Sequence, residues 1–562
     1  MQKLGEILIN KGLLSSQQLD ASLKEGERTG EALGKLLVKM KLLTEAQLLK
    51  ALAEQLEMSF EPSLKSVSIS KEAVSMVPAK LVWHYRFMPI KIKNNLLTIA
   101  VSDPLAVWAM EDLKLQLGFN VERILTTEEE ILNAIRQHYG LGADTVEEIL
   151  KEKKEEVSQE SEISSVKYTG EVEDVGKMAS AASVVSLVNQ ILSEAIMSDA
   201  TDIHIEPYRN NIKVRYRIDG VLYNIRVPEQ IKQLHQAIVS RIKIISNLDV
   251  VERRLPQDGR AIVKIQNKQV DLRISIIPSL YGENLVIRIL PVHLLLRLED
   301  LGFDAPDLEI MEKLMKSPHG IIFLTGPTGS GKTTTLYACL TRLNKETVKI
   351  VTLEDPIEYE LEGITQIQVK PEIGLTFANA LRSVLRHDPD IMMVGEVRDF
   401  ETAELAIRTS LTGHLIFSTL HTNDSPSGVT RLLDIGIEPY LVASSVNAFI
   451  SQRLVRIICP KCKKEQKNTK DLPNFLKDTK IFYGEGCEEC SFVGFKGRKA
   501  IYEILVIDDE MRELIVNKSP VSQIKKKAKE MGFRTLFDAG IEKVKQGVTT
   551  PEELMRVMQL EV

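Results

Sequence analysis

The 562-residue sequence has no long apolar run, no excess of basic residues and few cysteines. A membrane-spanning helix needs about 20 mostly apolar residues in a row, so none is expected. The N-terminus also does not fit a secretory signal peptide. The net charge is −6 at pH 7 and the isoelectric point is about 6.0. That balance argues against a protein that acts on nucleic acid through a broad basic surface, so no nucleic-acid partner is expected.

Four of the five cysteines form two close pairs, Cys459-Pro-Lys-Cys462 and Cys487-Glu-Glu-Cys490, separated by about 24 residues. Four thiols in this arrangement suit tetrahedral Zn²⁺. Disulfides would conflict with a reducing cytoplasm. The spacing predicts a structural zinc site in a small insert at about residues 456–500, with no ligand position open for catalysis. The fifth cysteine, Cys339, is expected to be a small core residue.

The most specific motif follows an apolar, β-branched run at residues 321–325. Residues 326–333 fit G-x-x-x-x-G-K-T without departure. Its glycines allow a tight turn whose N–H groups, with the start of the next helix, bind phosphate oxygens. Lys332 can reach the β- and γ-phosphates, and the Thr333 hydroxyl can ligate Mg²⁺. The sequence therefore predicts a site for ATP with Mg²⁺, made of Gly326, Pro327, Thr328, Gly329, Ser330, Gly331, Lys332, Thr333 and Thr334.

Residues 1–58 carry an internal repeat, because the pattern at residues 4–8 recurs at residues 33–37, about 29 residues later. Apolar positions at helical spacing predict two helix pairs, with helix starts near Ser15 and Thr44.

This tandem pattern resembles the MshEN module of secretion and pilus ATPases, some of which bind cyclic di-GMP. The sequence departs from that family's ligand motif at Lys3, Gly26 and Ala32, and it matches the motif at Gln55. Lysine lacks the flat fork with which arginine stacks on guanine and bonds phosphate. The resemblance therefore leaves two interpretations open, a cyclic di-GMP site and a helical docking module.

Two further segments precede the phosphate loop. Residues 59–140 read as a small α/β unit, with a helix predicted at 71–76 and strands at 88–93 and 96–101. Residues 141–178 are acid-rich and poor in aromatic residues, which predicts a flexible linker.

Residues 179–290 read as a second α/β unit that supplies arginines. Arg215 and Arg217 alternate along one predicted strand, and Arg273 lies on a later one. Such arginines are as often solvated or salt-bridged as functional. This unit has no phosphate loop, so its arginines lack an obvious local anion, and the γ-phosphate of a neighbouring subunit would supply one. Arg217 and Arg273 are therefore candidates for catalysis across a subunit boundary.

Three later segments resemble the boxes of the ATPases that drive type II secretion and type IV pilus assembly. Residues 352–359 (TLEDPIEY) are similar to the aspartate box, residues 388–399 (DPDIMMVGEVRD) to the atypical Walker B, and residues 412–424 to the histidine box. The resemblance covers essentially the whole chain from about residue 179. It implies a multidomain α/β protein with a RecA-like P-loop ATPase core at residues 291–562. A PAS-like α/β domain, the helical MshEN-like module and the small zinc-binding insert complete the expected fold.

These boxes offer the groups that ATP hydrolysis needs. Phosphoryl transfer to water requires charge neutralisation and a positioned water. Because an apolar strand is predicted just before Glu396, this carboxylate should lie at the sheet edge near the phosphate loop and organise Mg²⁺ and the water. Glu354 and Glu358 are the second source of carboxylates, and which one polarises the water stays open. His421 can hydrogen-bond the γ-phosphate, and His414 less directly.

The resemblance implies a hexameric cytoplasmic ATP hydrolase that drives pilin polymerisation through an inner-membrane platform protein and associates with that membrane through its partners. The long linker and single helical repeat module favour type IV pilus assembly over type II secretion. The zinc insert, absent from retraction-type relatives, favours an assembly or secretion motor. The alternative of another class is a nucleotide-binding regulatory protein that does not hydrolyse ATP.

Overall fold

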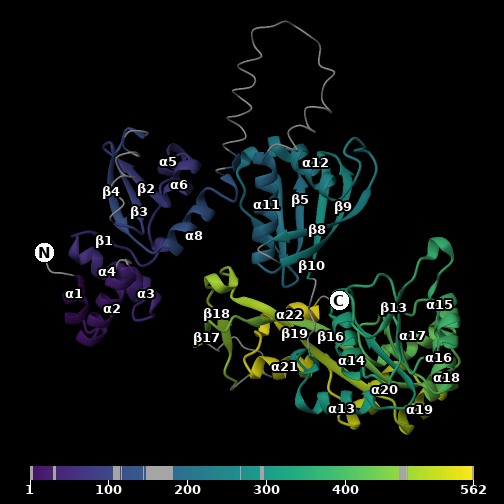
Figure 1. Cartoon of the computed structure of the whole chain (residues 1–562). Helices are drawn as coiled ribbons and strands as arrows, with labels where there is room; N and C mark the ends of the chain where they lie inside the picture. Colours follow the sequence, from purple (N-terminus) through teal and green to yellow (C-terminus); the bar gives the residue numbers. More distant parts are fainter. Residues whose placement is uncertain are drawn as a thin grey trace, which may run out of the picture. The chain divides into compact units, whose positions relative to one another are not determined.

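The computed structural model describes residues 4–29, 33–104, 114, 117–143, 145–146, 182–265, 268–291, 297–466, 476 and 479–559. The chain forms two compact units, residues 1–289 and 290–562 (Figure 1). Most of the predicted linker at 141–178 lies outside the described residues, as do Lys3 and Ala32 of the predicted dinucleotide motif. No helix within the described ranges is long and apolar enough to cross a bilayer.

Two helix pairs form the start of the first unit, which confirms the helical repeat. Gly5 packs against Leu19, and Gly34 packs against Leu48 in the same way 29 residues later. In both cases a Cβ atom on the glycine would lie 3.1 Å or less from the leucine side chain, so the repeat needs the small residue there. The helices are α1 (Leu4–Asn10), α2 (Ser16–Thr29), α3 (Leu33–Lys39) and α4 (Glu45–Gln55).

A four-stranded sheet follows, in the order β1-β4-β3-β2. The helix predicted at residues 71–76 is confirmed as α5, and the two predicted strands correspond to β2 and β3. The elements are β1 (Ser59–Phe60), α5 (Lys71–Met76), α6 (Ala79–Tyr85), β2 (Phe87–Lys93), β3 (Leu96–Val101), β4 (Asn120–Leu125) and α8 (Glu128–His138).

The first unit ends with a six-stranded sheet in the order β7-β6-β5-β10-β9-β8. Alternation along β5 turns Ile203 and Ile205 into a core shared with helices α11 and α12, and it turns Asp202, His204 and Glu206 to the other face. The elements are α11 (Ala182–Met197), β5 (Ala200–Pro207), β6 (Ile212–Ile218), β7 (Val221–Ile225), α12 (His235–Ile245), β8 (Gln257–Ile265), β9 (Lys268–Ser279) and β10 (Gly282–Pro291).

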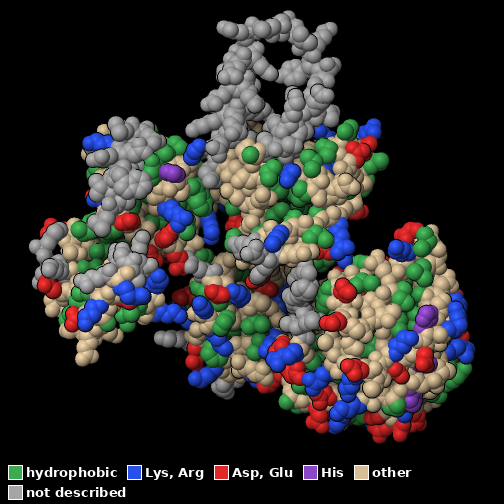
Figure 2. Space-filling view, viewed as in Figure 1, with side chains coloured by type: hydrophobic (Ala, Val, Ile, Leu, Met, Phe, Trp, Pro, Cys, Tyr) green, Lys and Arg blue, Asp and Glu red, His purple; other side chains and the backbone are tan. Residues whose placement is uncertain are grey.

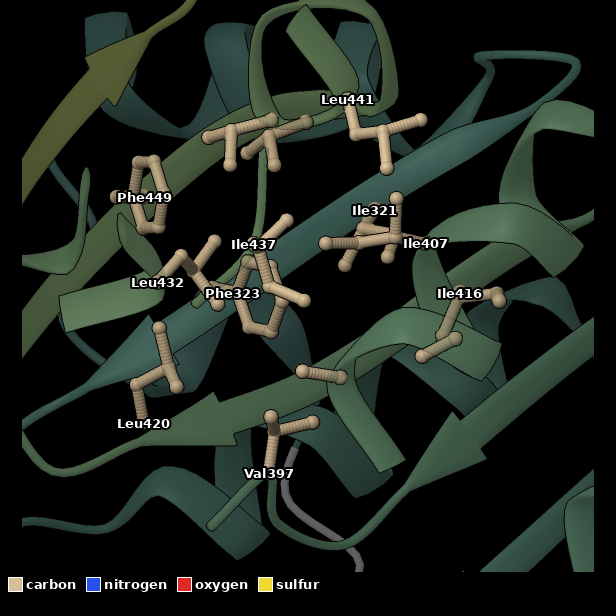
Figure 3. Packing of buried hydrophobic residues seen from close by; sticks show 14 of the residues in the cluster. Ile321, Phe323, Val397, Ile407, Ile416, Leu420, Leu432, Ile437, Leu441 and Phe449 are labelled. Atoms are coloured by element: carbon tan, nitrogen blue, oxygen red, sulfur yellow. The ribbon is translucent and has the colours of Figure 1, made fainter. Parts of the chain in front are cut away.

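The second unit is built on a seven-stranded sheet in the order β13-β12-β14-β15-β11-β16-β19. The strands are parallel as far as β16, and β19 pairs with β16 in the antiparallel sense. Figure 3 shows the apolar side chains on one face, where Phe323 of β11 and Phe449 of β16 stack with their ring centroids 5.6 Å apart. The strands are β11 (Gly320–Thr325), β12 (Ile350–Glu354), β13 (Thr365–Gln368), β14 (Ile391–Val394), β15 (Leu415–Leu420), β16 (Val446–Ile458) and β19 (Phe495–Val506).

Helices cover this sheet and fill the C-terminal part of the unit. The short strands β17 (Lys463–Glu465) and β18 (Phe482–Gly484) form a separate hairpin in the insert between β16 and β19. The helices are α13 (Ala305–Met315), α14 (Lys332–Leu343), α15 (Phe377–Val384), α16 (Phe400–Leu411), α17 (Pro426–Ile435), α18 (Pro439–Ser445), α19 (Asp509–Val516), α20 (Val521–Glu530), α21 (Leu536–Lys545) and α22 (Pro551–Gln559).

Candidate active site

The phosphate loop connects β11 to α14, in the middle of the parallel sheet. Gly329 and Gly331 have φ angles of 80° and 88°, which residues with a side chain rarely adopt. At Gly326 a Cβ atom would lie 2.7 Å from the Gln452 carbonyl oxygen and 2.8 Å from Ser330 Oγ. Strand β16 therefore packs closely against the loop. Backbone conformation requires glycine at positions 329 and 331, and lack of space requires it at position 326.

Lys332 folds back onto this loop. Its Nζ donates to the carbonyl oxygens of Gly326, at 2.7 Å, and Pro327, at 3.0 Å. Burial and, to a smaller extent, the nearby charge of Arg453 lower the pKa of Lys332 to about 8, although the charge of Glu396 acts in the opposite direction. A cation desolvated in this way gains from an incoming anion.

Ser330 offers a second indication of a phosphate site. Its Oγ is buried and has no hydrogen-bond partner among the described residues. Buried hydroxyls in folded proteins are nearly always paired, so an orphan at the centre of this loop is consistent with a ligand oxygen as its partner. The loop thus fits a triphosphate, with Thr333 beside it at the start of α14.

Glu396 lies just beyond the carboxyl end of β14, as the sequence predicts. Its Oε2 is 2.7 Å from Arg398 Nε and 3.5 Å from His421 Nε2. Since Glu396 also acts on the pKa of Lys332, the fold brings Lys332, Glu396 and His421 to one edge of the sheet. The carboxylate is mostly buried, whereas the His421 side chain is 48% exposed and open to the site.

Glu354 is buried in a closed polar network at the end of β12. It accepts hydrogen bonds from the Tyr337 hydroxyl, from Thr352 Oγ1 at 2.5 Å and from Gln366 Nε2 at 3.1 Å. The backbone N–H of Glu358 donates to the same Tyr337 hydroxyl, at 3.3 Å. Because its oxygens are already engaged, Glu354 is better placed to hold α14 against β12 than to orient a water.

The two histidines of the histidine box lie at opposite ends of β15. His421 follows the strand and lies on the phosphate-loop side, whereas His414 precedes it. His414 Nδ1 is hydrogen-bonded with the Thr409 carbonyl oxygen, at 3.1 Å. Six strand residues separate the two by about 20 Å. The expectation that His414 acts on the γ-phosphate is therefore wrong for this fold.

In the first unit the candidate arginines have carboxylate partners. Arg215 Nη2 lies 2.6 Å from Glu206 Oε1, and this hydrogen bond raises the pKa of Arg215. Arg217 Nε lies 3.7 Å from Asp202 Oδ2. The expectation that these arginines lack a local anion is therefore wrong, because strand register places acidic residues beside them.

Arg273 lies on β9, and β5 and β10 separate that strand from β6 with Arg217. Three strand spacings amount to about 14 Å. The sheet therefore does not bring the two predicted trans-acting arginines into contact with each other.

The four predicted zinc ligands converge. Their Sγ atoms all lie within 4.8 Å of one another, and the separations of Cys459 from Cys487 and of Cys462 from Cys490 are 3.7 and 3.8 Å. Thiolates about 2.3 Å from a tetrahedral Zn²⁺ lie about 3.8 Å apart. The backbone N–H groups of Gly486 and Gly494 point at the sulfurs of Cys462 and Cys490, each at 3.3 Å. The cluster fits a closed structural zinc site.

Two residues beside the phosphate loop belong to no sequence motif and were not predicted. Gln452 Nε2 donates to the Ser330 carbonyl oxygen, at 2.9 Å, and its Oε1 accepts from Thr335 Oγ1, at 2.9 Å. Arg453 follows it on β16 and is buried. They are more than 100 residues from the loop in sequence, and only the neighbouring positions of β11 and β16 in the sheet reveal them.

Comparisons with known proteins agree with this geometry. The family model described as "Type II/IV secretion system protein" matches residues 177–556. The type IV pilus assembly ATPase PilB of Myxococcus xanthus is 40% identical, over 98% of both chains. The type II secretion system protein E of Xanthomonas campestris is 38% identical, over 99% of this chain and 98% of the relative.

Among solved structures, the ATPase DotB of Legionella pneumophila has a TM-score of 0.52 at 21% identity, over 66% of this chain and 95% of that chain. This likeness concerns the fold alone. The predicted fold class, a multidomain α/β protein with a RecA-like core, an MshEN domain and a Cys₄ insert, is confirmed.

The "MshEN domain" model matches residues 56–145. This segment contains the four-stranded sheet, which the sequence reading treats as a separate small α/β unit. The MshEN name was expected for the helical repeat at residues 1–58, and the match lies almost entirely beyond it.

Proposed function

The chain belongs to the Type II/IV secretion system protein family, which includes type IV pilus and type II secretion ATPases, and we propose that it is a motor that hydrolyses ATP to drive pilin polymerisation. The observation that carries the proposal is the convergence of Lys332, Glu396 and His421 beside an intact phosphate loop. The 40% identity to a type IV pilus assembly ATPase over nearly all of both chains supports the assignment to pili.

Each of these side chains has a distinct role in the proposed reaction. Lys332 and the N–H groups of the loop bind the β- and γ-phosphates, and they hold the γ-phosphorus in line for attack. Thr333 would hold Mg²⁺, which supplies charge neutralisation on the phosphate oxygens. Glu396, oriented by Arg398 and adjacent to His421, positions the attacking water and accepts a hydrogen bond from it. His421 donates to the γ-phosphate and stabilises the charge that develops there.

Phosphate release by the purified protein tests this function. Steady release with Mg-ATP supports a motor, and ATP binding without any turnover, measured on the assembled ring, supports the regulatory alternative. Type II secretion is the second candidate, because a type II secretion protein E matches 99% of the chain at 38% identity. A deletion strain that loses surface pili and keeps secretion of exoproteins decides for pilus assembly.

The proposal includes a homo-hexamer, an inner-membrane platform protein as partner, and a cytoplasmic location at the membrane through that partner. Analytical ultracentrifugation with Mg-ATP tests the hexamer, and cell fractionation with and without the platform protein tests the location. No nucleic-acid partner is proposed. The face drawn in Figure 2 mixes Lys and Arg with Asp and Glu side chains, without a broad basic surface.

A cyclic di-GMP site in the N-terminal part remains a hypothesis. It is supported by the MshEN match at residues 56–145. The departures at Lys3, Gly26 and Ala32 from the ligand motif weigh against it. Isothermal titration of the full chain with cyclic di-GMP separates a dinucleotide site from a docking module.

Zinc in the Cys₄ cluster is a separate proposal, with one ion per chain. Cys459→Ser leaves three soft ligands, so it should release the metal and loosen the insert while ATP still binds at the distant loop. Elemental analysis and a thiol titration check it, with Cys339→Ser as the control, because Cys339 is buried away from the cluster. Wild-type protein that contains no metal as purified, and in which these four thiols titrate as free, would contradict the proposal.

A further inference from the structure

A buried arginine contacts both the phosphate loop and the segment that carries His421. Arg453 lies on β16 and is 4% exposed. A guanidinium in such a position costs desolvation free energy, so its contacts must compensate for that cost. Those contacts lie on two sides of the candidate active site.

The sheet fixes where Arg453 lies. Strand β16 runs parallel to β11, with Ser451 opposite Thr325 at the last position before the phosphate loop. The stacked rings of Phe323 and Phe449 keep the two strands in this register (Figure 3). Gln452 therefore comes level with Gly326, the first glycine of the loop, and Arg453 follows one residue later.

On one side Arg453 packs against that glycine. Its Nη1 lies 3.0 Å from where a Cβ atom of Gly326 would stand, and it donates to the Gln452 carbonyl oxygen at 3.1 Å. Its charge is also close enough to act on Lys332, and it is a cause of the lowered pKa of that lysine. Arg453 thus belongs to the surroundings of the phosphates.

On the other side Arg453 holds the histidine loop, residues 421–425. Its Nη2 donates to the Asn423 carbonyl oxygen, at 2.8 Å, and Ser451 Oγ donates to the same oxygen at 3.1 Å. Asn423 is two residues from His421, whose Nε2 lies 3.5 Å from Glu396. The planar fork of one arginine therefore joins the Gln452 carbonyl oxygen, which lies beside the first glycine of the phosphate loop, to the backbone of the histidine loop.

We propose that Arg453 is a positioning residue that couples occupancy of the phosphate loop to the placement of His421. An incoming γ-phosphate attracts the guanidinium as well as Lys332, and the bond to the Asn423 carbonyl carries that displacement to His421. The proposal rests on the proposed function for its catalytic consequence, although the structural coupling itself can be measured without turnover.

Hydrogen exchange tests the coupling directly. In the wild type, saturating Mg-AMP-PNP should slow amide exchange in residues 421–425 as well as in the phosphate loop. In Arg453→Gln, the phosphate loop should still be protected at saturating nucleotide, whereas residues 421–425 should exchange as in the free protein. Equal protection of residues 421–425 in both proteins would overturn the proposal, whether or not the wild type hydrolyses ATP.

Two variants separate positioning from charge and from folding. Arg453→Lys keeps the charge but has no fork to join two carbonyl oxygens, so it should behave like Arg453→Gln and not like the wild type. Ser451→Ala removes the other donor to the Asn423 oxygen and should keep the wild-type exchange pattern. Full activity of Arg453→Lys, or a loss in Ser451→Ala equal to that in Arg453→Gln, would contradict a coupling role.

Turnover supplies the second readout. Arg453→Gln should lower kcat about 100-fold with a much smaller change in KM, because the histidine and not the nucleotide is displaced. His421→Ala should lower kcat similarly, and the double variant should be no worse than either single variant. Losses that multiply would show that Arg453 acts independently of His421. A wild type without turnover would overturn the proposed function, and the exchange experiment would still decide the coupling.

Discussion

The cationic side chains of the two larger sheets have different kinds of partner. In the six-stranded sheet of the first unit, Arg215 has Glu206 as its partner and Arg217 has Asp202. In the parallel sheet of the second unit, Lys332 donates to two carbonyl oxygens of its own loop. The carboxylate beside Arg215 raises its pKa, whereas burial lowers the pKa of Lys332 to about 8. Glu206 thus pairs with Arg215, and Asp202 is shared between Arg217 and Arg288. Lys332 is bonded to neutral carbonyl oxygens, so it gains from an incoming anion.

The largest expected effect comes from removing Lys332. Lys332→Ala should weaken ATP binding roughly 100-fold and abolish hydrolysis, because a charge-assisted bond to the β- and γ-phosphates is lost. Titration with a fluorescent ATP analogue measures the affinity. Lys316→Ala is the control, since Lys316 is exposed in the same unit. ATP affinity within a few-fold of the wild type in Lys332→Ala would contradict the assignment.

Glu396→Gln should have the next largest effect and should separate binding from chemistry. The amide keeps the size of the side chain but is a poor base, so ATP should stay bound while turnover falls about 10³-fold. Single-turnover phosphate release measures this, with the exposed Glu360→Gln as control. Unchanged turnover in the Gln variant would move the role to Glu354 or Glu358, although the network around Glu354 argues against that residue.

Features that are encoded within a short stretch of sequence could be predicted. The phosphate loop, the paired cysteines and the helical repeat are each encoded within short stretches, and the structure forms them where the patterns lie. The position of Glu396 could also be predicted, because a short apolar strand followed by a carboxylate fixes which sheet edge that side chain reaches.

The rest depends on strand order and register, which single-sequence patterns do not encode. Asp202 neutralises Arg217 because β5 and β6 pair with those two residues opposite each other. Arg453 reaches the phosphate loop because β16 lies beside β11, on the side opposite β15. His414 and His421 belong to one box, yet the strand between them separates them.

Arg217 tests the cations of the six-stranded sheet in the first unit, and its expected effect is moderate. If Arg217 acts on the nucleotide of a neighbouring subunit, Arg217→Ala should cut hydrolysis about tenfold or more and leave ATP binding nearly unchanged. Asp202→Asn removes its local partner but keeps the arginine, so it should retain most of the activity. Mixed rings of Arg217→Ala and Lys332→Ala subunits should regain some turnover. Equal losses in Arg217→Ala and Asp202→Asn, without rescue in verified mixed rings, would assign Arg217 to the fold of its own sheet.

The smallest expected effect is a difference between the two units in how their free energy of unfolding changes in mild acid. In the second unit, burial raises the pKa of Glu553, but Arg556 and Arg456 lower it, with a net lowering. The stability that this carboxylate contributes is therefore lost only below its usual pKa of 4.5.

In the first unit, burial lowers the pKa of His235 at the start of α12 below its usual 6.5, and the Glu283 backbone and charge oppose this only in part. Between the lowered pKa and 6.5 the unfolded chain binds more protons than the folded one, so the free energy of unfolding falls as the pH drops. The loss is at most about 1.4 kcal/mol per pH unit. Hydrogen exchange of α12 at pH 7 and 5.5, corrected for intrinsic rates, should show this loss, and His235→Gln should remove it. The exposed His387→Gln in the second unit is the matched control. If α12 kept the same acid sensitivity in His235→Gln, the buried histidine would not be its source.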